Sequence, residues 1–509
     1  MLGEVSQCTA SAPRYRRLCF MACAASLFIG LVAAVVGLSY FDHQHNNIIH
    51  EYVARQDDVA ILSATYYSQS RSFPNNTVVL LLNAHQVLHL KHSELYGIST
   101  NASGPMKTSF RIYPVVQQIP FYCKWVPFIA VGQVSEQITS LQLSTGERGM
   151  TVSIRRPFRK RRNVVACFSP LFLNERWQLL LLTAEVYSYF GASMHFYVRS
   201  MIADLFAMLS RYPNVRIEPW PGVSLGSKRA TSNSFDPNIE LEFRNQASAM
   251  TDCLLMYKES AKFIIFPDTD DVIIPRLGRT YLEEFEKVFN VYPDAAVIAY
   301  NMSQSAITTT TSPSTYSPVD ILKSLQFKGE TRWGKLVVRP ERTDSAWIHR
   351  SYGIREGFKQ VTLPIELNSA LHLRFWSFVN QSRLSDDILP SYNPLLKNLS
   401  GPALVDRTDL EKIHRNFMAR AHEMSNVYDG LPVVSIYYPL IEQCYNRIFY
   451  NGEQHSKCKG PELCDLPQFP GVRCVNVQSQ YETFDAYDRI FLHRLVTSRF
   501  EHSNLGCLV

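Results

Sequence analysis

The regular alternation of apolar strands and helices between residues 163 and 300 constrains the fold of this 509-residue chain more than any other feature. The predicted strands are Val164–Phe168, Met194–Val198, Val215–Trp220 and Lys262–Phe266. The predicted helices are Asn174–Phe190, Met201–Tyr212 and Asn245–Ser260. Strands that are separated by helices imply a parallel sheet covered on both faces, so the sequence predicts an α/β fold.

Ligands of such sheets bind beyond the carboxyl ends of the strands, so the residues that follow each strand are candidates for chemistry. Neither a Gly-x-Gly-x-x-Gly loop nor a Gly-Lys-Ser/Thr loop follows any of the predicted strands. The sequence therefore argues against a dinucleotide-binding fold and against a P-loop ATPase.

One strand leads directly into three carboxylates. The apolar strand that ends at Phe266 runs through Pro267 to Asp268, Asp270 and Asp271. Three carboxylates within four residues repel one another unless a cation binds them or they share a proton. Hard divalent cations such as Mg²⁺ and Mn²⁺ bind carboxylate oxygens and keep positions open for substrate phosphate. The motif therefore predicts a metal site, in preference to an acidic turn that caps the next helix.

Two enzyme classes place such a motif at the end of a strand. In GT-A glycosyltransferases the carboxylates hold a metal that neutralises the diphosphate leaving group of a nucleotide sugar. In haloacid-dehalogenase-type phosphatases the first carboxylate, here Asp268, would be the nucleophile and the second, here Asp270, an acid/base. The phosphatase motif normally lies on the first strand of its domain, whereas about 100 residues of strand–helix alternation precede this one,. A catalytically silent glycan-binding ectodomain is the third hypothesis.

A series of short motifs makes a more specific resemblance. The motifs occur in order along the chain at Cys167–Pro170, Asn174–Trp177, Gly191–Tyr197, Thr251–Leu254, Phe266–Asp271, Trp333–Lys335, Arg339–Glu341, Ile348–His349 and Ala370–Arg374. This ordered set resembles glycosyltransferase family 92. A single Asp-x-Asp would be weak support, but the ordered set covers about 210 residues,.

The resemblance implies a GT-A-like (Rossmann-like) mixed sheet and an inverting galactosyltransferase of the Golgi. It implies UDP-galactose as the donor, Mn²⁺ (or Mg²⁺) as the cofactor and a glycan, in some members a glycan fucose, as the acceptor. The nucleotide-sugar-binding residues that it implies are Asp268, Asp270, Gln246, Asp252, Lys335 and Arg374. The metal ligands that it implies are Asp268, Asp270 and His372.

This chain departs from the family pattern at two positions. Asp271 stands where the family usually has Glu, and its side chain is shorter by one methylene, so a direct ligand role is not expected for it. Leu373 replaces the Tyr of a His-Tyr-Arg triplet, while His372 and Arg374 match. The imidazole of His372 is expected either to bind the metal or to donate to a phosphate.

An inverting transfer also needs a carboxylate that takes a proton from the acceptor hydroxyl. Four carboxylates downstream of the acidic motif are candidates for this base. They are Glu341, Asp344, Glu356 and Glu366, and the sequence does not choose among them.

The N-terminal part of the chain predicts a membrane anchor. Residues 18–40 carry no charge and match the length of about 20 residues that crosses a bilayer,. Three Arg precede this stretch, which favours a cytosolic N-terminus and a type II protein of the Golgi or another secretory-pathway membrane,. A cleaved signal peptide is the alternative. The predicted organisation is a tail at 1–17, the span at 18–40, a stem at 41–74, a β-rich subdomain at 75–160, the glycosyltransferase domain at 163–430 and a cysteine-containing extension at 431–509.

Sequons and cysteines agree with a lumenal body. The glycosylation sequons begin at Asn75, Asn101, Asn301, Asn380 and Asn398, all on the predicted lumenal side,. Eight of the 11 cysteines lie on that side, where disulfides are expected,. The cluster Cys444, Cys458, Cys464 and Cys474 lacks the CxxC spacing of a zinc ribbon, so a disulfide-stapled loop is expected there,.

The net charge of +6 does not indicate a nucleic-acid partner. Two short segments, 1–17 and Arg155–Arg162, contain the basic excess, and the remainder is slightly acidic. A nucleic-acid binder spreads Lys and Arg over a whole face. The run Arg155–Arg162 is expected to be a solvated linker, and Arg159–Arg162 would also suit a processing protease that cleaves after basic residues. The oligomeric state stays open.

Overall fold

The computed structural model describes residues 58–86, 95–115, 123–144, 149–225, 236–241, 243, 245–379, 389–395, 402–451, 458–487 and 490–509. The predicted tail, membrane span and first part of the stem lie outside the described residues, as do the sequons at Asn380 and Asn398. Among the described residues, none of the helices combines the length and apolar character that a bilayer span requires.

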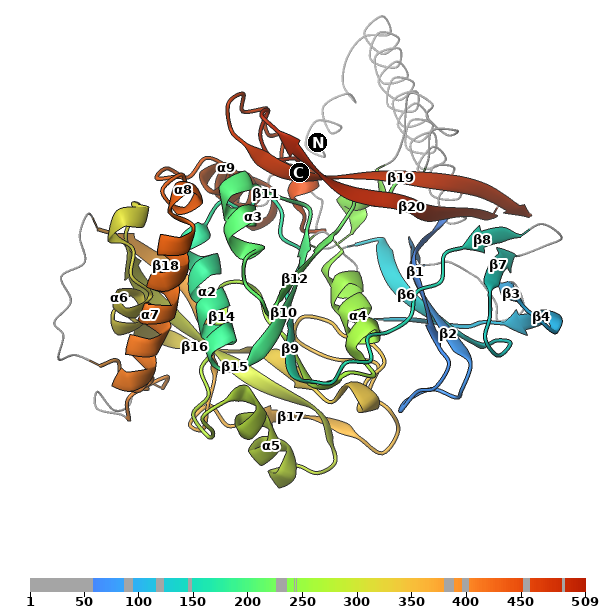
Figure 1. The fold of residues 1–509 in the computed structure, drawn as a ribbon, viewed down its shortest axis with the longest axis horizontal. Coiled ribbons are helices and arrows are strands. Elements are labelled where there is room, and N and C mark those ends of the chain that lie inside the picture. Colours follow the sequence, from blue (N-terminus) through green and yellow to red (C-terminus); the bar gives the residue numbers. More distant parts are fainter. Residues whose placement is uncertain are drawn as a thin grey trace, which may run out of the picture. The chain divides into compact units, whose positions relative to one another are not determined.

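A nine-stranded mixed sheet forms the centre of the molecule (Figure 1). Its strands are β9 (Arg162–Cys167), β10 (Ala192–Val198), β12 (Val215–Pro219), β13 (Ala261–Phe266), β14 (Asp271–Ile273), β15 (Ala295–Thr309), β16 (Gln326–Val338), β17 (Lys359–Leu363) and β18 (Ala370–Phe378). The order is β12-β10-β9-β13-β16-β15-β18-β14, with β17 paired to β15. The four strands β12, β10, β9 and β13 are parallel, and β16 is antiparallel to β13. The predicted α/β fold with a mixed sheet is confirmed.

Alternate residues of β9 show that helices cover both faces of this sheet. Val164 and Ala166 belong to one cluster with the apolar residues of α2 (Trp177–Tyr189), α3 (Ala203–Leu209) and α5 (Tyr281–Val291). Val165 and Cys167 belong to another cluster with α4 (Gln246–Tyr257). The two clusters follow from the period of two along a strand.

Helix α2 is buried almost all round, which a helix requires when it has neighbours on two sides,. It packs against β10 on one side and against α7 (Arg407–Glu423) on the other (Figure 1). Pro318–Lys323 (α6) also contacts α7, and Ser425–Tyr428 (α8) contacts α3. Tyr437–Tyr445 (α9) continues into a π-helical turn at Asn446–Tyr450.

A second sheet of seven strands joins the two ends of the described chain. Its order is β11-β19-β20-β1-β2-β6-β5. The strands are β1 (Asp58–Tyr67), β2 (Thr77–His85), β5 (Arg111–Pro114), β6 (Trp125–Gln133), β11 (Ser200–Ile202), β19 (Cys474–Tyr487) and β20 (Ile490–Ser503). A separate four-stranded sheet has the order β4-β3-β7-β8, with β3 (Tyr96–Asn101), β4 (Gly104–Ser109), β7 (Ser140–Ser144) and β8 (Met150–Val152).

The structure differs from the predicted organisation at both ends. Strand β1 lies inside the segment predicted as a stem, and β19 and β20 form a long ribbon rather than a separate extension (Figure 1). The reason is long-range pairing, because β20 lies parallel to β1 and completes its sheet. Asp58 accepts a hydrogen bond from His493 Nε2 at 2.8 Å across this pairing.

The predicted disulfides are present. The pairs are Cys123–Cys458, Cys167–Cys253, Cys444–Cys464 and Cys474–Cys507. The expected stapled loop is only partly right, because Cys458 and Cys474 bond to cysteines outside the predicted cluster. The bridge from Cys167 to Cys253 ties the carboxyl end of β9 to α4.

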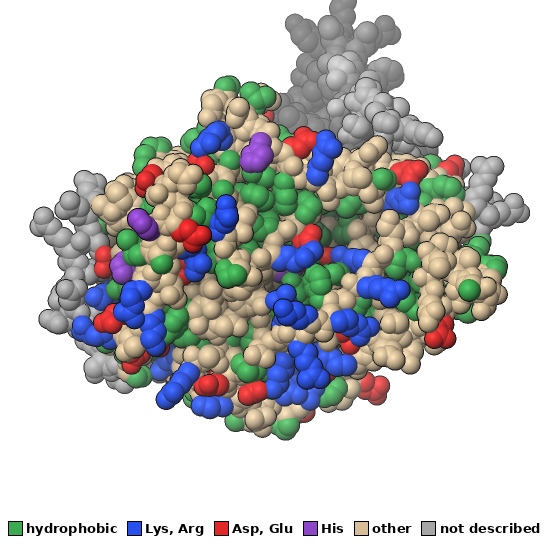
Figure 2. Space-filling model, in the orientation of Figure 1, with side chains coloured by type: hydrophobic (Ala, Val, Ile, Leu, Met, Phe, Trp, Pro, Cys, Tyr) green, Lys and Arg blue, Asp and Glu red, His purple; other side chains and the backbone are tan. Residues whose placement is uncertain are grey.

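The basic run before β9 is mostly solvated. Arg156 and residues 159–161 are exposed, which agrees with the solvated linker that the sequence predicts. Arg155 differs, because its guanidinium pairs with Asp252 of α4. Figure 2 shows Lys and Arg side chains gathered mainly on the lower half of the face drawn, rather than spread evenly over it. Cleavage in this run stays a prediction.

The described sequons lie in different settings. Asn75 is exposed in the loop between β1 and β2. Asn101 is half-buried at the end of β3, where its Nδ2 donates to Glu136 O at 2.8 Å. Asn301 lies within β15, and its Oδ1 is buried without a hydrogen bond to the described residues. Glycosylation at these positions stays a prediction.

Candidate active site

The acidic motif follows the carboxyl end of β13, where the sequence analysis expects ligands to bind. Residues 268–271 form a turn in which Asp271 N donates to Asp268 O at 3.1 Å. Asp271 then begins β14, which pairs antiparallel with β18. In this register Asp271 lies opposite His372, so the sheet brings together two residues that are 101 positions apart.

Asp270, Asp271 and His372 form a cluster in which one ligand atom of each lies within 4.8 Å of the others. His372 Nδ1 is 3.0 Å from Asp271 Oδ1 and 3.7 Å from Asp270 Oδ2. The Asp271 side chain is fully buried, whereas that of Asp270 is 34% exposed. Two carboxylates and an imidazole are a donor set that fits a divalent cation.

The two neighbouring carboxylates of this cluster repel each other, and the pKa values of its three groups are shifted. Burial and the neighbouring Asp271 carboxylate raise the pKa of Asp270 to about 6,. Burial also favours a higher pKa for Asp271, but Lys335 and His372 outweigh it and hold that pKa below its usual range. Burial opposes the charged form of His372, yet the hydrogen bond with Asp271 and the charge of Asp270 raise its pKa.

Asp268 forms a separate group of contacts. Its carboxylate accepts hydrogen bonds from Lys335 Nζ at 2.5 Å, from Gln246 Nε2 at 3.0 Å and from Ser169 Oγ. Lys335 is almost fully buried and also lies 3.0 Å from Asp271 Oδ2, so one ammonium joins two carboxylates of the motif. The family resemblance implies Asp268, and not Asp271, as a metal ligand. The structure groups Asp271 with Asp270 and His372, and groups Asp268 with Lys335 and Gln246.

Gln246 has a free acceptor in this region. It is the first residue of α4 and is buried. Its Nε2 is used by Asp268 and Ser169, but its Oε1 has no hydrogen bond to any described residue. A buried carbonyl oxygen without a donor loses free energy, so a ligand donor near this atom would stabilise the site.

The structure places Asp252 in a different cluster. Its carboxylate pairs with Arg155 and accepts from Tyr197 Oη at 2.7 Å and from Ser63 Oγ at 2.8 Å. Burial raises the pKa of Asp252, but the charge and hydrogen bonds of Arg155 outweigh it and lower the pKa overall. The side chain is thus held by β1, β10 and the basic run, and not by the acidic motif.

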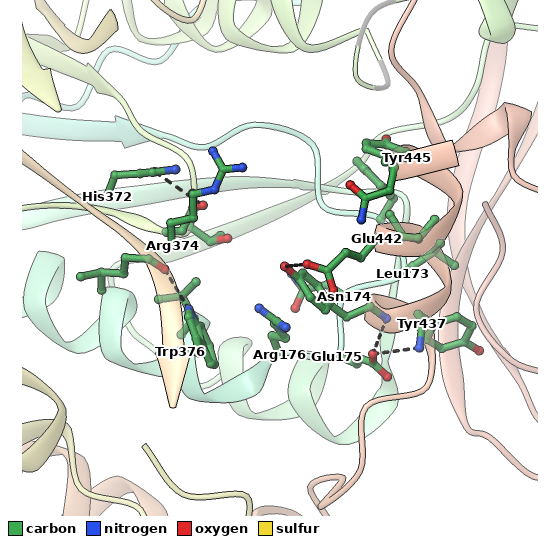
Figure 3. Close-up of a pocket in the computed structure, with 18 of the residues that line it drawn as sticks. Leu173, Asn174, Glu175, Arg176, His372, Arg374, Trp376, Tyr437, Glu442 and Tyr445 are labelled. Atoms are coloured by element: carbon green, nitrogen blue, oxygen red, sulfur yellow. Dashed lines mark hydrogen bonds and ion pairs between the residues drawn. The ribbon is translucent and has the colours of Figure 1, made fainter. Parts of the chain in front are cut away.

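A pocket of about 470 Å³ opens beside the acidic cluster (Figure 3). Asp270, His372 and Arg374 line it on the side of β18. On the opposite side, side chains of α9 and the π turn line it, among them Tyr437, Tyr438, Glu442, Tyr445 and Tyr450. Figure 3 shows Glu442 and Tyr445 facing His372 and Arg374 across the pocket.

The four carboxylates that the sequence nominated as the base do not line this pocket. Asp344 is engaged by Lys258 Nζ at 2.9 Å and Arg355 Nη2 at 3.1 Å. Glu341 Oε1 lies 4.0 Å from Arg339, and Glu356 and Glu366 are exposed.

Sequence reasoning missed the α9 side of the pocket. No motif of the resemblance falls in this part of the chain, so the sequence predicts only a cysteine-containing extension there. The available signal is the aromatic run around Tyr437, Tyr438 and Tyr445, together with Trp376 on β18.

Several known proteins match this chain, some of them over most of its length. A sequence model described as "Glycosyltransferase family 92" matches residues 162–420. The Caenorhabditis elegans protein named "Glycosyltransferase family 92 protein F59C6.8" is 52% identical over 94% of this chain and 94% of its own length. The C. elegans protein named "Glycosyltransferase family 92 protein F13G3.3" is 30% identical over 84% of this chain and 86% of its own. The C. elegans "Beta-1,4-galactosyltransferase galt-1" is 26% identical over 33% of this chain and 36% of its own.

The family model ends in α7, so it includes the acidic motif, Lys335 and His372 but not α9. The match with the 52% identical relative covers nearly the whole chain, including α9. The sequence resemblance, the α/β fold and these matches agree, and the chain belongs to glycosyltransferase family 92.

Proposed function

We propose that this glycosyltransferase is a metal-dependent, inverting hexosyltransferase of GT-A-like fold that transfers galactose from UDP-galactose to a glycan acceptor, such as the fucose of an N-glycan. One observation carries the proposal: the cluster Asp270, Asp271 and His372 borders a pocket large enough for part of a sugar substrate. The relative named as a β-1,4-galactosyltransferase supports galactose as the sugar. Family membership argues against the phosphatase hypothesis and against a catalytically silent ectodomain.

The donor set favours Mn²⁺ over Mg²⁺, because one of its three ligands is an imidazole, and Mg²⁺ strongly prefers oxygen,. A divalent cation bound there would neutralise the diphosphate that leaves with the nucleotide.

Other side chains would hold the donor. Arg374 is exposed at the pocket, where its guanidinium would donate to phosphate oxygens,. The free Oε1 of Gln246 would accept from a donor group of the nucleotide sugar. Lys335 would act mainly on Asp268 and Asp271, because it is buried between them.

We also propose a lumenal catalytic domain on a type II anchor in the Golgi or another secretory-pathway membrane. The uncharged stretch at 18–40, preceded by three Arg, supports the anchor,. The four disulfides support an oxidising compartment, since disulfides are rare in the cytosol,.

A panel of UDP-sugars tests the activity. The purified lumenal part would be incubated with each donor, with fucosylated and non-fucosylated N-glycans, and with Mn²⁺ or a chelator. UDP release and the mass of the product glycan would be measured. We expect UDP-galactose to give the highest rate, and the chelator to abolish it.

Asp270→Asn tests the site, and Asp294→Asn is the matched control, because Asp294 is an exposed partner of Lys359 away from the pocket. We expect the first variant to lose at least about 100-fold in transfer, and the control to keep its rate. Equal rates for both variants, or UDP release that the chelator leaves unchanged, would contradict the proposal.

A further inference from the structure

Three carboxylates line the pocket beside the acidic cluster: Asp270, Glu175 and Glu442. Asp270 belongs to the cluster that fits a cation. The two oxygens of Glu175 accept hydrogen bonds from the backbone N–H groups of Ile436 at 2.7 Å, Tyr437 at 2.8 Å and Tyr438 at 2.8 Å. Glu175 therefore caps the start of α9 and has a structural role.

Glu442 is the third carboxylate, and no ion pair with it is found among the described residues. Its one hydrogen-bond contact is with Tyr438 Oη, which lies 3.5 Å from Glu442 Oε1. The residue is exposed, so its carboxylate can meet an incoming substrate. Glu442 lies one turn after Tyr438 on the same face of α9, and that face lines the pocket,.

The helix that carries Glu442 is anchored at both ends. Glu175 holds the start of α9, and the disulfide between Cys444 and Cys464 ties its last turn to a later segment. The helix then widens into the π turn at Asn446–Tyr450, and such turns occur frequently at functional sites,. Figure 3 shows Glu442 reaching into the pocket from the side opposite His372 and Arg374.

The surroundings of Glu442 fit a sugar. Arg176 lies over the ring of Tyr438 and 4.6 Å from the centroid of Trp376, and all three side chains line the pocket. Aromatic rings beside polar groups suit the mixed apolar and polar surface of a hexose. On its outer side Glu442 also borders a second hollow of about 480 Å³, whose lining includes Gln443, Asn446, Arg447 and Asn451. These amide and guanidinium groups match sugar hydroxyls.

We propose that Glu442 is the general base of the transfer and that α9 with its π turn is the wall on which the acceptor glycan binds. The inference rests on the proposed function and names its acceptor side. The acceptor sugar occupies the pocket between Trp376 and α9, and the rest of the glycan follows into the outer hollow.

Every bond and proton of the proposed transfer step is accounted for when Glu442 is the base. An acceptor hydroxyl attacks the anomeric carbon of the donor hexose, and a new C–O bond forms there. The bond between that carbon and the diphosphate oxygen breaks, and its electron pair leaves with UDP. The hydroxyl proton passes to the Glu442 carboxylate, which returns it to solvent.

The test compares Glu442→Gln with Glu423→Gln. Glu423 ends α7, is exposed and does not line either hollow, so it is a matched control. UDP-galactose, Mn²⁺ and a fucosylated N-glycan serve as probes. We expect kcat of Glu442→Gln to fall by about 100-fold or more, which is the range for loss of a general base. The control should match wild type.

Two further readouts separate catalysis from folding. Binding of UDP with Mn²⁺, measured by calorimetry, should stay within about a factor of two in Glu442→Gln, because the donor side is untouched. Glu442→Asp keeps a carboxylate that is one methylene shorter, so it should recover part of the lost kcat. Both variants should melt at the wild-type temperature.

The outcomes are distinguishable. An active wild type with an equally active Glu442→Gln contradicts the assignment of the base alone. Loss of folding or of UDP binding in both Glu442 variants contradicts it as well, because the role would then be structural. A wild-type protein that releases no UDP from any sugar donor contradicts the proposed function itself.

Discussion

Lys335 is a buried cation between two carboxylates, Asp268 at 2.5 Å and Asp271 at 3.0 Å. Burial alone would lower the pKa of Lys335, but the charges of the two carboxylates raise it overall, so the ammonium stays charged. A buried ion pair adds little net stability compared with apolar residues, yet removal of one partner leaves the other charge uncompensated. The residue is therefore a structural support of the acidic motif.

Lys335→Met should lower the free energy of unfolding by about 3–5 kcal/mol, because two carboxylates lose their buried counter-ion,. Urea unfolding at neutral pH measures the change. Lys262→Met is the control, since Lys262 and Glu286 form an exposed pair, and it should change stability by less than about 1 kcal/mol,. Similar losses of unfolding free energy in both variants would contradict the claim that the buried ammonium of Lys335 supports the acidic motif.

His195 predicts a pH dependence of stability. Its ring is buried beside Tyr257 Oη at 3.2 Å, and burial lowers its pKa to about 3. The unfolded chain binds a proton near pH 6.5, whereas the folded chain does not until about pH 3,. The unfolded state therefore gains protons as pH falls through this window, and stability is lost progressively between pH 6.5 and 3.

His195→Gln should weaken this acid sensitivity. Between pH 7 and 4.5 the wild type should lose about 2 kcal/mol more than the variant, measured by urea unfolding at each pH. His422→Gln, at an exposed position on α7, is the matched control. Parallel pH profiles for wild type and His195→Gln would contradict the assignment.

At the scale of elements, two features build the site: the register between β14 and β18, and the capped helix α9. The pairing of β14 with β18 sets His372 opposite Asp271, so the cluster depends on that register and not on local sequence. Glu175, just before α2, caps α9 and so connects the family-92 part of the chain to the C-terminal wall of the pocket.

Glu175→Ala should loosen α9 by removing the acceptor of three backbone N–H groups. Loss of such a cap typically costs about 1–2 kcal/mol. Hydrogen exchange of the backbone amides of residues 436–445 should become faster, while exchange in α5 stays unchanged. Unchanged protection in α9 would show that other contacts hold the helix.

The local patterns predicted much of the central sheet. The strands β9, β10, β12 and β13 and the helices α2 and α4 lie where hydrophobic runs and their spacing placed them. The segment predicted as one helix at Met201–Tyr212 instead begins with β11, which pairs with β19. That strand was missed because its partner is more than 270 residues away.

Long-range pairing also explains what the sequence could not predict about the site. The resemblance nominated His372, and only the register of β18 shows that Asp271, rather than Asp268, stands beside it. The sequence does not predict a role for Glu442, because α9 reaches the pocket through tertiary contacts with Glu175, which no local pattern encodes.

At the scale of the whole molecule, disulfides connect segments that lie far apart in the sequence. Cys123–Cys458 closes a separation of 335 residues, whereas Cys474–Cys507 closes one of 33. A crosslink restricts the unfolded chain more when its loop is longer, although measured effects are smaller than this model gives. The first bridge joins the β-rich N-terminal part to the segment just beyond α9.

Replacement of Cys123 and Cys458 by Ser should therefore lower stability by about 2–5 kcal/mol. The same replacement of Cys474 and Cys507 should cost less in this model, because the closed loop is shorter,. Thermal unfolding of the two double variants under non-reducing conditions measures the difference. A larger loss for the Cys474–Cys507 variant would contradict the loop-length argument.

The central claim is that Asp270, Asp271 and His372 bind a divalent cation that assists transfer from a UDP-sugar. Calorimetric titration of Mn²⁺ into the protein in the presence of UDP tests it directly, with His372→Ala compared with His422→Ala as the control. The account predicts one Mn²⁺ per chain in wild type and control, and an affinity at least about tenfold weaker in His372→Ala. Equal Mn²⁺ affinity in His372→Ala and wild type would contradict it.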